Sequence, residues 1–275
     1  MNVWIDGALV DAGSAHVSPF DHALLTGDGV FETLKWYGGR GVFALRRHLE
    51  RLERSAHGLG LAVPDRSTLE RAVVETAEAN LDGDDGRVRV TLTGGPAPLG
   101  SDRGEARPTL IVAAAPTTPW PGTCDVAVCP WPRNERGATA GLKTVSYAEN
   151  VVALAWAKER GAGEAIFANT LGHLCEGTGT NVFLVVDGRL VTPPLSSGCL
   201  EGVTRDLVIE CTGASEEDIP ASALADAEEA FLTSTTREVQ PIAHVDGRAL
   251  PAAPGRRTSE AAAAFKDLVA RTLDP

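Results

Sequence analysis

Only four lysines occur among the 275 residues, and the surroundings of one of them suit covalent chemistry. Lys158 and Lys266 lie in charged segments that are typical of solvated helix faces. Lys143 instead stands in GLKTVSYAEN among small and apolar neighbours, which predicts partial burial. A buried ammonium group is costly unless its pKa falls or it forms a Schiff base with a carbonyl compound. Lys143 is therefore either a reactive, partly buried amine or an exposed lysine in a loop.

A second candidate is Glu176 in CEGTGTNVF (175–183), where a glutamate directly precedes an apolar strand pattern. Its carboxylate either binds the backbone amides of the adjacent turn or serves a ligand. The segments LEGVTRD (200–206) and LTSTTRE (232–238) add glycine and hydroxyl residues, the former at the predicted start of a helix. Amides at a helix N-terminus favour a phosphate, although a threonine there is also an ordinary cap.

Other reaction classes lack their signatures. The chain has no GxxxxGK[ST], GxSxG or HExxH, and its six histidines do not stand at metal-ligand spacing, so no metal is expected. Lysine plus arginine number 25 against 37 aspartates plus glutamates, and the net charge of −12 argues against nucleic-acid or anionic-membrane partners. No signal peptide and no apolar run of roughly 18 residues is evident. Five scattered cysteines without a CxxC predict free thiols in a reducing cytoplasm.

The elements that position these residues mix strands and helices without a regular alternation, which predicts an α+β fold in two domains. The prolines of PTTPWPG (116–122) cannot continue a central strand, so this segment is interpreted as a linker. The expected boundaries are 1–115 for an N-terminal α+β domain, 116–123 for the linker and 124–275 for a C-terminal domain. Helices are expected at 46–59, after capping boxes at Ser67–Glu70 and Ser146–Glu149, near Gly202 and at about 259–273, and strands at 87–94, 109–115, 124–129, 164–168 and 181–186.

Six segments in order along the chain resemble one known family: GDGVFETLKWYGG, HLERL, GLKTVSYAEN, EAIFANTLGHLCEGTGTNVF, PPLSSGCLEGVTR and STTREVQPI. They are similar to the class IV aminotransferases, which are pyridoxal-phosphate (PLP) enzymes of fold type IV. The family includes D-amino acid transaminases, branched-chain transaminases and aminodeoxychorismate lyase. The resemblance implies a two-domain fold with a C-terminal cofactor-binding domain, amino acid and 2-keto acid substrates, and a homodimer. Each active site would lie between the domains and be completed by the partner's N-terminal domain.

The resemblance also implies roles for individual residues. Lys143 matches the lysine that binds the cofactor covalently and moves the substrate proton, and Glu176 matches the carboxylate that keeps the pyridine nitrogen protonated. Arg51 matches the arginine that pairs bidentately with the cofactor phosphate. The remaining cofactor contacts implied are Tyr147 to the phenolic oxygen, Leu200 to the ring face, and Val203, Thr204 and Thr235 to the phosphate.

Substrate recognition separates the subfamilies. The arginine and histidine that trap the substrate carboxylate in the best-known D-amino acid transaminases are replaced by Leu99 and Ser101, and Phe31 replaces a tyrosine. Because RVRVTLTG (87–94) alternates strictly, Arg89 lies on the face opposite the apolar one, and it is expected to bind the substrate α-carboxylate. The alternative cations are Arg103, Arg133 and Arg237. Phe31, Arg89 and Thr236 are thus the expected substrate-binding residues.

The motifs favour a transaminase that acts on D-amino acids. The pair Thr235–Thr236 resembles the D-type enzymes, and the opening GDGVFETLKWYGG resembles the D-type enzymes and the lyase alike. Tyr147, in contrast, resembles the tyrosine of branched-chain enzymes. Aminodeoxychorismate lyase, which releases pyruvate and 4-aminobenzoate, is the first alternative. A branched-chain L-amino acid aminotransferase is the second.

Overall fold

The computed structural model describes residues 1–275. The chain forms two compact units, and each consists of segments that are far apart in the sequence. The first comprises Met1–Thr118, Leu142–Tyr147 and Thr272–Pro275, and the second comprises Pro119–Gly141 and Ala148–Arg271. The expected division differs from this one mainly in two stretches, because 142–147 and the last four residues group with the first unit.

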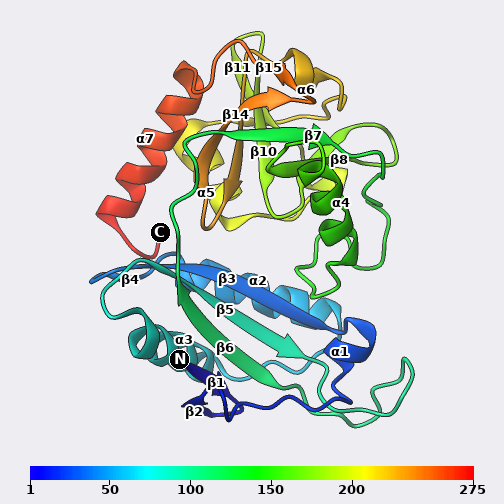
Figure 1. Ribbon diagram of the computed structural model, residues 1–275, viewed down its shortest axis with the longest axis vertical. Helices are drawn as coiled ribbons and strands as arrows, with labels where there is room; N and C mark the ends of the chain where they lie inside the picture. The colour runs from blue at the N-terminus through cyan, green and yellow to red at the C-terminus, as the bar shows by residue number, and fades with distance from the viewer. The chain divides into compact units, whose positions relative to one another are not determined.

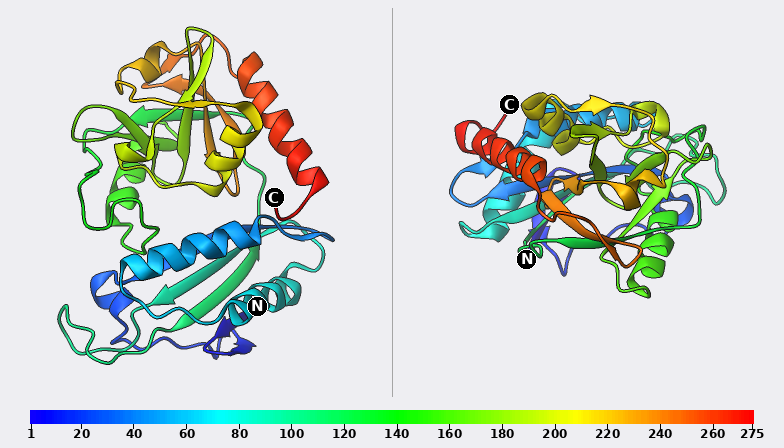
Figure 2. Two further views of the ribbon diagram at one scale, coloured as in Figure 1. Left: turned by 180° about the vertical axis from the view of Figure 1, so that it is seen from behind. Right: turned by 90° about the horizontal axis from the view of Figure 1, so that it is seen from above.

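The first unit is a six-stranded antiparallel sheet with two long helices on one of its faces (Figures 1 and 2). The strand order is β2-β1-β6-β5-β3-β4. Its elements are β1 (Asn2–Ile5), β2 (Ala8–Asp11), α1 (His22–Thr26), β3 (Gly29–Tyr37), β4 (Gly41–Val42), α2 (Leu45–Gly58), α3 (Arg66–Leu81), β5 (Gly86–Thr93) and β6 (Leu110–Pro116).

The core of the first unit lies between the sheet and the helices α2 and α3. Val88, Val90 and Leu92 of β5 are buried there, whereas Arg87 and Arg89 are exposed on the other face. The strict alternation of this strand is therefore confirmed. Leu49 and Leu52 of α2 enter the same core, one helical turn apart.

Two predicted helix caps are wrong. Helix α3 begins at Arg66, and its N-cap is Asp65, whose carboxylate accepts from the Thr68 amide at 2.9 Å. Ser67 lies inside the helix and donates its hydroxyl to the same carboxylate. Ser146 precedes the next helix of the chain, but its hydroxyl donates to the carbonyl of Gly27 at 2.8 Å. In α3, the carboxylate of Asp65 takes the capping position in place of Ser67, because aspartate and serine are equally good N-caps.

The second unit contains a nine-stranded mixed sheet with helices packed against it (Figure 1). The order is β12-β11-β10-β13-β14-β7-β8-β9, and β15 pairs with β14. Its elements are β7 (Cys124–Val128), α4 (Ala148–Lys158), β8 (Glu164–Ala168), β9 (Leu174–Gly177), β10 (Asn181–Val186), β11 (Arg189–Thr192), a 3₁₀ turn η1 (Leu195–Ser197), α5 (Val203–Thr212), β12 (Ser215–Glu216), α6 (Ala223–Asp226), β13 (Glu229–Ser234), β14 (Glu238–Val245), β15 (Arg248–Ala249) and α7 (Arg256–Arg271).

Both faces of this second sheet are covered. On β8, Ala165 and Phe167 pack with α4, whereas Ile166 between them joins a separate apolar cluster on the other face. Parallel pairs (β7 with β8, β14 with β7) and antiparallel pairs coexist. Helices and sheets mix in both units, which confirms the α+β class.

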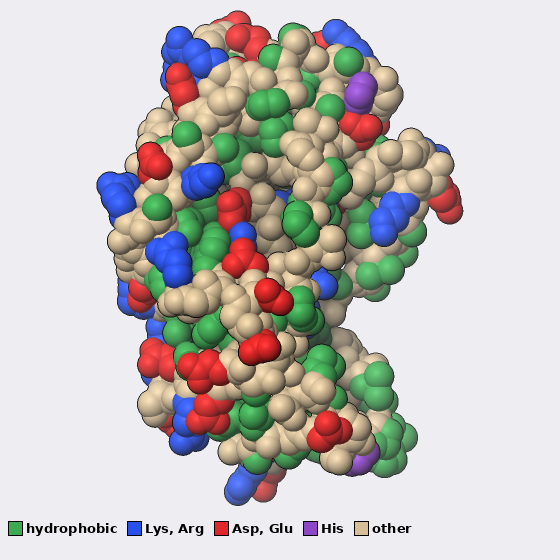
Figure 3. All heavy atoms as spheres, turned by 60° about the vertical axis from the view of Figure 1, so that its left-hand side comes forward, with side chains coloured by type: hydrophobic (Ala, Val, Ile, Leu, Met, Phe, Trp, Pro, Cys, Tyr) green, Lys and Arg blue, Asp and Glu red, His purple; other side chains and the backbone are tan.

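Three features of the structure concern its surface charge, its helices and its cysteines. On the face drawn in Figure 3, acidic and basic side chains are interspersed. None of the helices combines the length and the apolar composition that crossing a bilayer requires. All five cysteines are free thiols, and four of them are buried.

Candidate active site

Lys143 is held in the first unit between α2 and β3. Its backbone amide donates to Ser55 Oγ of α2 at 3.0 Å, and its carbonyl accepts from the Phe31 amide of β3 at 3.1 Å. The next residue forms a bridge to the sheet, Thr144 to Val30. The lysine is half-buried. Its backbone is therefore fixed, as a side chain that must attack a bound molecule requires.

Four of the predicted site residues meet around the ring of Phe31. Lys143 Nζ lies 4.4 Å and Arg89 Cζ 3.8 Å from the ring centroid, and the Tyr147 ring meets it edge-on at 5.1 Å. Lys143 Nζ is also 3.5 Å from the Tyr147 hydroxyl. Register explains the meeting, because β3 and β5 pair Phe31 with Thr91 and thereby place Phe31 and Arg89 diagonally on one face.

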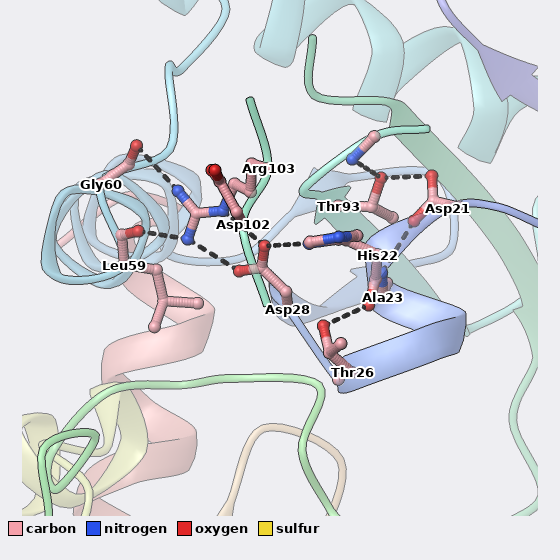
Figure 4. A network of polar contacts seen from close by, with 12 residues as sticks. Asp21, His22, Ala23, Thr26, Asp28, Leu59, Gly60, Thr93, Asp102 and Arg103 are labelled. Carbon is pink, nitrogen blue, oxygen red and sulfur yellow. Dashed lines mark hydrogen bonds and ion pairs between the residues drawn. The ribbon is translucent and has the colours of Figure 1, made fainter. Parts of the chain in front are cut away.

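Arg103, the first alternative carboxylate ligand, is occupied by other partners (Figure 4). Its guanidinium forms a bidentate pair with Asp28 and donates to the carbonyls of Leu59 and Gly60 at the end of α2. Asp28 also contacts the ring of His22 at 3.4 Å. The arginine thus fastens the loop after β5 to the rest of the first unit.

The other two alternatives are paired as well. Arg237 Nη2 lies 3.1 Å from Glu164, and both side chains are buried. Arg133 contacts Glu149 at 3.1 Å and Glu176 at 3.4 Å. Arg89 differs from these arginines, because its partners are the Thr91 hydroxyl and the Phe31 ring and it pairs with no carboxylate.

Arg51 lies in a buried charged cluster that the sequence did not predict. Its Nε and Nη2 donate to the two oxygens of Glu32 at 2.7 and 2.8 Å, and His48 Nδ1 contacts the same carboxylate at 2.8 Å. The guanidinium edge formed by Nε and Nη2 is therefore engaged by Glu32. A phosphate would have to bind on the other side of the group, through the Nη atoms.

Burial and charge set the protonation of this cluster. Burial alone would raise the pKa of Glu32, but the charge of Arg51 and the hydrogen bonds from Arg51 and His48 outweigh it and hold that pKa well below its usual value. Burial lowers the pKa of His48, and the positive charges of Arg51 and Lys143 lower it further against the opposing effect of Glu32. At neutral pH the cluster therefore contains a carboxylate, a guanidinium and a neutral imidazole that donates from Nδ1.

Glu176 lies in the second unit at the end of β9, with its side chain 13% exposed. One of its oxygens accepts from the Leu200 amide at 2.9 Å, and the other lies 3.4 Å from Arg133 Nε. The carboxylate is thus held by donors and retains access to solvent, which suits a ligand contact better than a turn cap.

Two of the predicted phosphate residues, Val203 and Thr204, lie in the first turn of α5. Gly202 is the N-cap, and the amides of Val203 and Thr204 occupy the first turn. A Cβ at Gly202 would lie 2.0 Å from Asn181 Oδ1, so a larger residue there would require the Asn181 side chain to move. Thr235 and Thr236 lie in the turn between β13 and β14, and β13 pairs with β10 through Thr233 and Asn181.

These residues fit pyridoxal phosphate. The first unit offers a half-buried amine, Lys143, for the aldehyde of the cofactor. The second unit offers a carboxylate held by donors for the ring nitrogen, and the N-terminus of a ten-residue helix that begins after Gly202 for the phosphate. No group of three or more His, Cys, Asp or Glu side chains is placed to hold a metal ion.

Glu32 and His48 were not among the predicted site residues, and the contact between Arg133 and Glu176 was not predicted either. A signal for Glu32 exists, because it stands between Val30 and Leu34 on the buried face of β3, where an apolar residue is the rule. His48 is a comparable signal, because it is a polar residue on the buried face of α2. No comparable signal exists for Arg133, whose pairing with Glu176 depends on tertiary structure.

Comparisons with known proteins identify the family of the chain. The chain matches the family model of the class IV aminotransferases over residues 29–245. A putative branched-chain-amino-acid aminotransferase of Methanocaldococcus jannaschii is 34% identical over 281 residues, which cover 98% of this chain and 96% of that protein. A bifunctional aminodeoxychorismate lyase and D-amino acid transaminase of Mycobacterium tuberculosis is 30% identical over 279 residues, with 92% and 94% covered.

Solved structures agree with this assignment. The crystal structure of a branched-chain aminotransferase from Thermoproteus uzoniensis with norvaline has a TM-score of 0.90 and 36% identity, and the match covers 98% of this chain and 94% of that one. The protein therefore belongs to the class IV aminotransferases. It is a transaminase, and its cofactor is pyridoxal phosphate.

Proposed function

We propose that the protein transfers the amino group of branched-chain and related aliphatic L-amino acids to a 2-keto acid. The names of the relatives support this assignment, because both the 34% identical protein and the 36% identical structure are branched-chain aminotransferases. This proposal replaces the D-amino acid preference expected from the motifs. The observation that supports a substrate with a carboxylate is Arg89, a guanidinium without a carboxylate partner close to the ring that Lys143 also contacts, whereas the choice of branched-chain L-amino acids rests on the relatives.

The residues act in distinct ways. Pyridoxal phosphate, when bound, supplies a ring that withdraws electrons from the substrate Cα. Lys143 Nζ is the amine that binds the cofactor and then carries the proton of the substrate Cα, and Tyr147 supports it from 3.5 Å. Glu176 holds a proton on the ring nitrogen. Thr236 and Phe31 contact the substrate.

The phosphate is proposed to bind at two groups of donors. The amides of Val203 and Thr204 and the hydroxyl groups of Thr204 and Thr235 form the first group, and the Nη atoms of Arg51 form the second. Leu200 covers the ring face and donates its own amide to Glu176. Helix amides suit this role because they bind an anion without a change of protonation.

The spectrum of the bound cofactor tests the substrate class directly. We expect L-leucine to convert the yellow holoenzyme to its pyridoxamine form with release of the matching keto acid. Conversion by D-alanine and not by L-leucine would establish a D-amino acid transaminase. Pyruvate and an aromatic amine formed from aminodeoxychorismate, without any pyridoxamine form, would establish the lyase.

Arg89 is proposed to bind a carboxylate of the substrate. Replacing Arg89 by Ala removes one charge-assisted pair, typically about 1.5–3 kcal/mol, so we expect KM for amino acids to rise at least about tenfold. A carboxylate-free donor such as (R)-1-phenylethylamine should lose much less. Steady-state kinetics with both donors measure the difference.

A control for this variant lies on the same face of the same strand. Arg87 is exposed, two residues from Arg89, so Arg87→Ala should leave both KM values within about twofold. Equal losses with both donors in Arg89→Ala would mean that Arg89 only supports the fold.

We also propose a cytoplasmic homodimer. Free thiols suit a reducing compartment. Phe20, Leu24 and Leu99 are 53%, 71% and 75% exposed, and the segments that bear them are joined by a hydrogen bond from the Ala97 amide to the Phe20 carbonyl. Such neighbouring apolar side chains are typical of an interface. Light scattering should give about twice 28.8 kDa, and an active particle of 28.8 kDa would contradict the dimer.

A further inference from the structure

Arg133 lies against the carboxylate of Glu176 and is held there from several sides. Its backbone amide donates to the Ala168 carbonyl at 2.7 Å, and its Nη2 donates to Asn150 Oδ1 at 3.1 Å. Its guanidinium stacks on the Phe167 ring at 4.1 Å. Phe167 is the cross-strand neighbour of Glu176, so the ring places the guanidinium beside that carboxylate.

One donor of Arg133 lacks an acceptor. Its Nε is buried and forms no hydrogen bond, and Glu176 Oε1 is the carboxylate oxygen that it faces, at 3.4 Å. A buried N–H group without an acceptor destabilises the folded chain. A small movement that brings an acceptor to Arg133 Nε would therefore be favourable. Rotation of the Glu176 carboxylate would complete this hydrogen bond.

The two thiols and the amide beside Glu176 supply no positive charge. Burial raises the pKa of the Cys199 thiol to about 11 and that of Cys175 still further, so both are neutral. The Leu200 amide is a neutral donor. Arg133, in contrast, places a positive charge against this carboxylate.

We infer that Arg133 is the positioning residue of Glu176. It fixes the orientation of the carboxylate and stabilises its negative charge, so that Glu176 presents an ionised oxygen to the ring nitrogen of the cofactor. This inference rests on the proposed role of Glu176. It also withdraws Arg133 from the substrate carboxylate, for which the sequence had offered it as an alternative.

The role predicts an effect that depends on the ring nitrogen. PLP and its carbocyclic analogue, in which CH replaces that nitrogen, can be titrated into the apo form of the full chain by fluorescence. Arg133→Gln should weaken PLP binding about tenfold, because the carboxylate loses the charged group that orients it toward the ring nitrogen. The affinity of Arg133→Gln for the analogue should lie within about twofold of the affinity of the wild type for the analogue, because the analogue makes no contact that depends on the charge of Glu176.

Two further variants separate positioning from folding. Arg133→Lys keeps the charge and should recover part of the PLP affinity, although it loses the planar fork. Glu149 is the other carboxylate partner of Arg133, and its side chain is 73% exposed. Glu149→Gln should therefore change neither the affinity for PLP nor the affinity for the analogue. In a Glu176→Gln background, Arg133→Gln should cause no additional loss, as expected for residues that act through one another.

The contrary outcomes are distinct. Equal losses for PLP and the analogue, or a full additional loss in the Glu176→Gln background, would show that Arg133 only supports the fold. A wild-type chain that binds the analogue as tightly as PLP would overturn the role of Glu176 itself, and with it the proposed function of this half of the site.

Discussion

Replacing Lys143 by Ala should abolish both the covalent attachment of the cofactor and turnover. The lysine combines a fixed backbone with a half-buried amine beside Phe31 and Tyr147. A positioned proton-transfer group contributes about 10²–10⁴-fold, and the loss of the covalent link adds to this. Borohydride reduction followed by peptide mass spectrometry should locate the cofactor on the peptide with Lys143 in the wild type and on none in the variant.

Lys35 provides the control, because it belongs to the same unit and its amine lies 4.4 Å over the Tyr37 ring. Lys35→Ala should retain the linked cofactor and activity within a few-fold. A cofactor that borohydride still attaches to Lys143→Ala would show that another lysine performs the chemistry.

The largest loss of stability is expected from Glu32→Gln. This change keeps the shape of the side chain but leaves the buried guanidinium of Arg51 without its paired carboxylate. Breaking a buried pair by removing one partner typically costs about 3–5 kcal/mol. Urea unfolding at pH 7 should show this decrease, and PLP affinity should fall with it because Glu32 fixes the orientation of Arg51.

A matched control lies on the exposed side of α2, the helix that bears Arg51. Arg46 and Glu50 form an i,i+4 pair at 3.3 Å with both side chains more than 40% exposed. Glu50→Gln should therefore cost less than about 0.5 kcal/mol. A comparably small cost for Glu32→Gln would mean that the cluster of Glu32, His48 and Arg51 contributes little to the fold.

The pH dependence follows from the direction of the Glu32 shift. Its pKa in the folded chain lies below the unfolded value, so its contribution to stability is complete above about pH 5 and is lost as the pH falls toward the folded pKa. The difference in unfolding free energy between wild type and Glu32→Gln should therefore shrink on acidification from pH 5 to pH 3.

Local patterns predicted the elements well where side-chain periodicity was clear. The alternation of β5 and the spacing of α2 led to strand and helix within one residue of their observed limits. Lys143 and Glu176 could be picked out because their immediate neighbours are unusual for charged residues. One cap error occurred where Asp65 and Ser67 compete within a few positions, and the other occurred because the Ser146 hydroxyl binds the distant Gly27 carbonyl.

Pairings between distant residues could not be predicted in this way. The partner of Arg51 comes from a strand, and that of Arg133 from a hairpin, so both depend on tertiary structure. The same reasoning explains Arg89, since nothing in its local sequence shows that it lacks a carboxylate partner while Arg103 and Arg237 have one. Substrate preference was harder still, because few side chains decide it and the motifs are shared across the family.

The segment Leu142–Tyr147 has a topological consequence. The chain passes from the first unit to the second at residue 118, returns for six residues and leaves again, and it returns once more at residue 272. A break at the proline-rich connection would therefore not release two self-sufficient modules. The piece ending at residue 118 would keep β3 and α2, which hold the lysine, while the lysine itself would depart with the other piece. Chain connectivity thus gives both pieces a share in placing Lys143, and neither piece alone would hold this lysine in the setting that the intact chain provides.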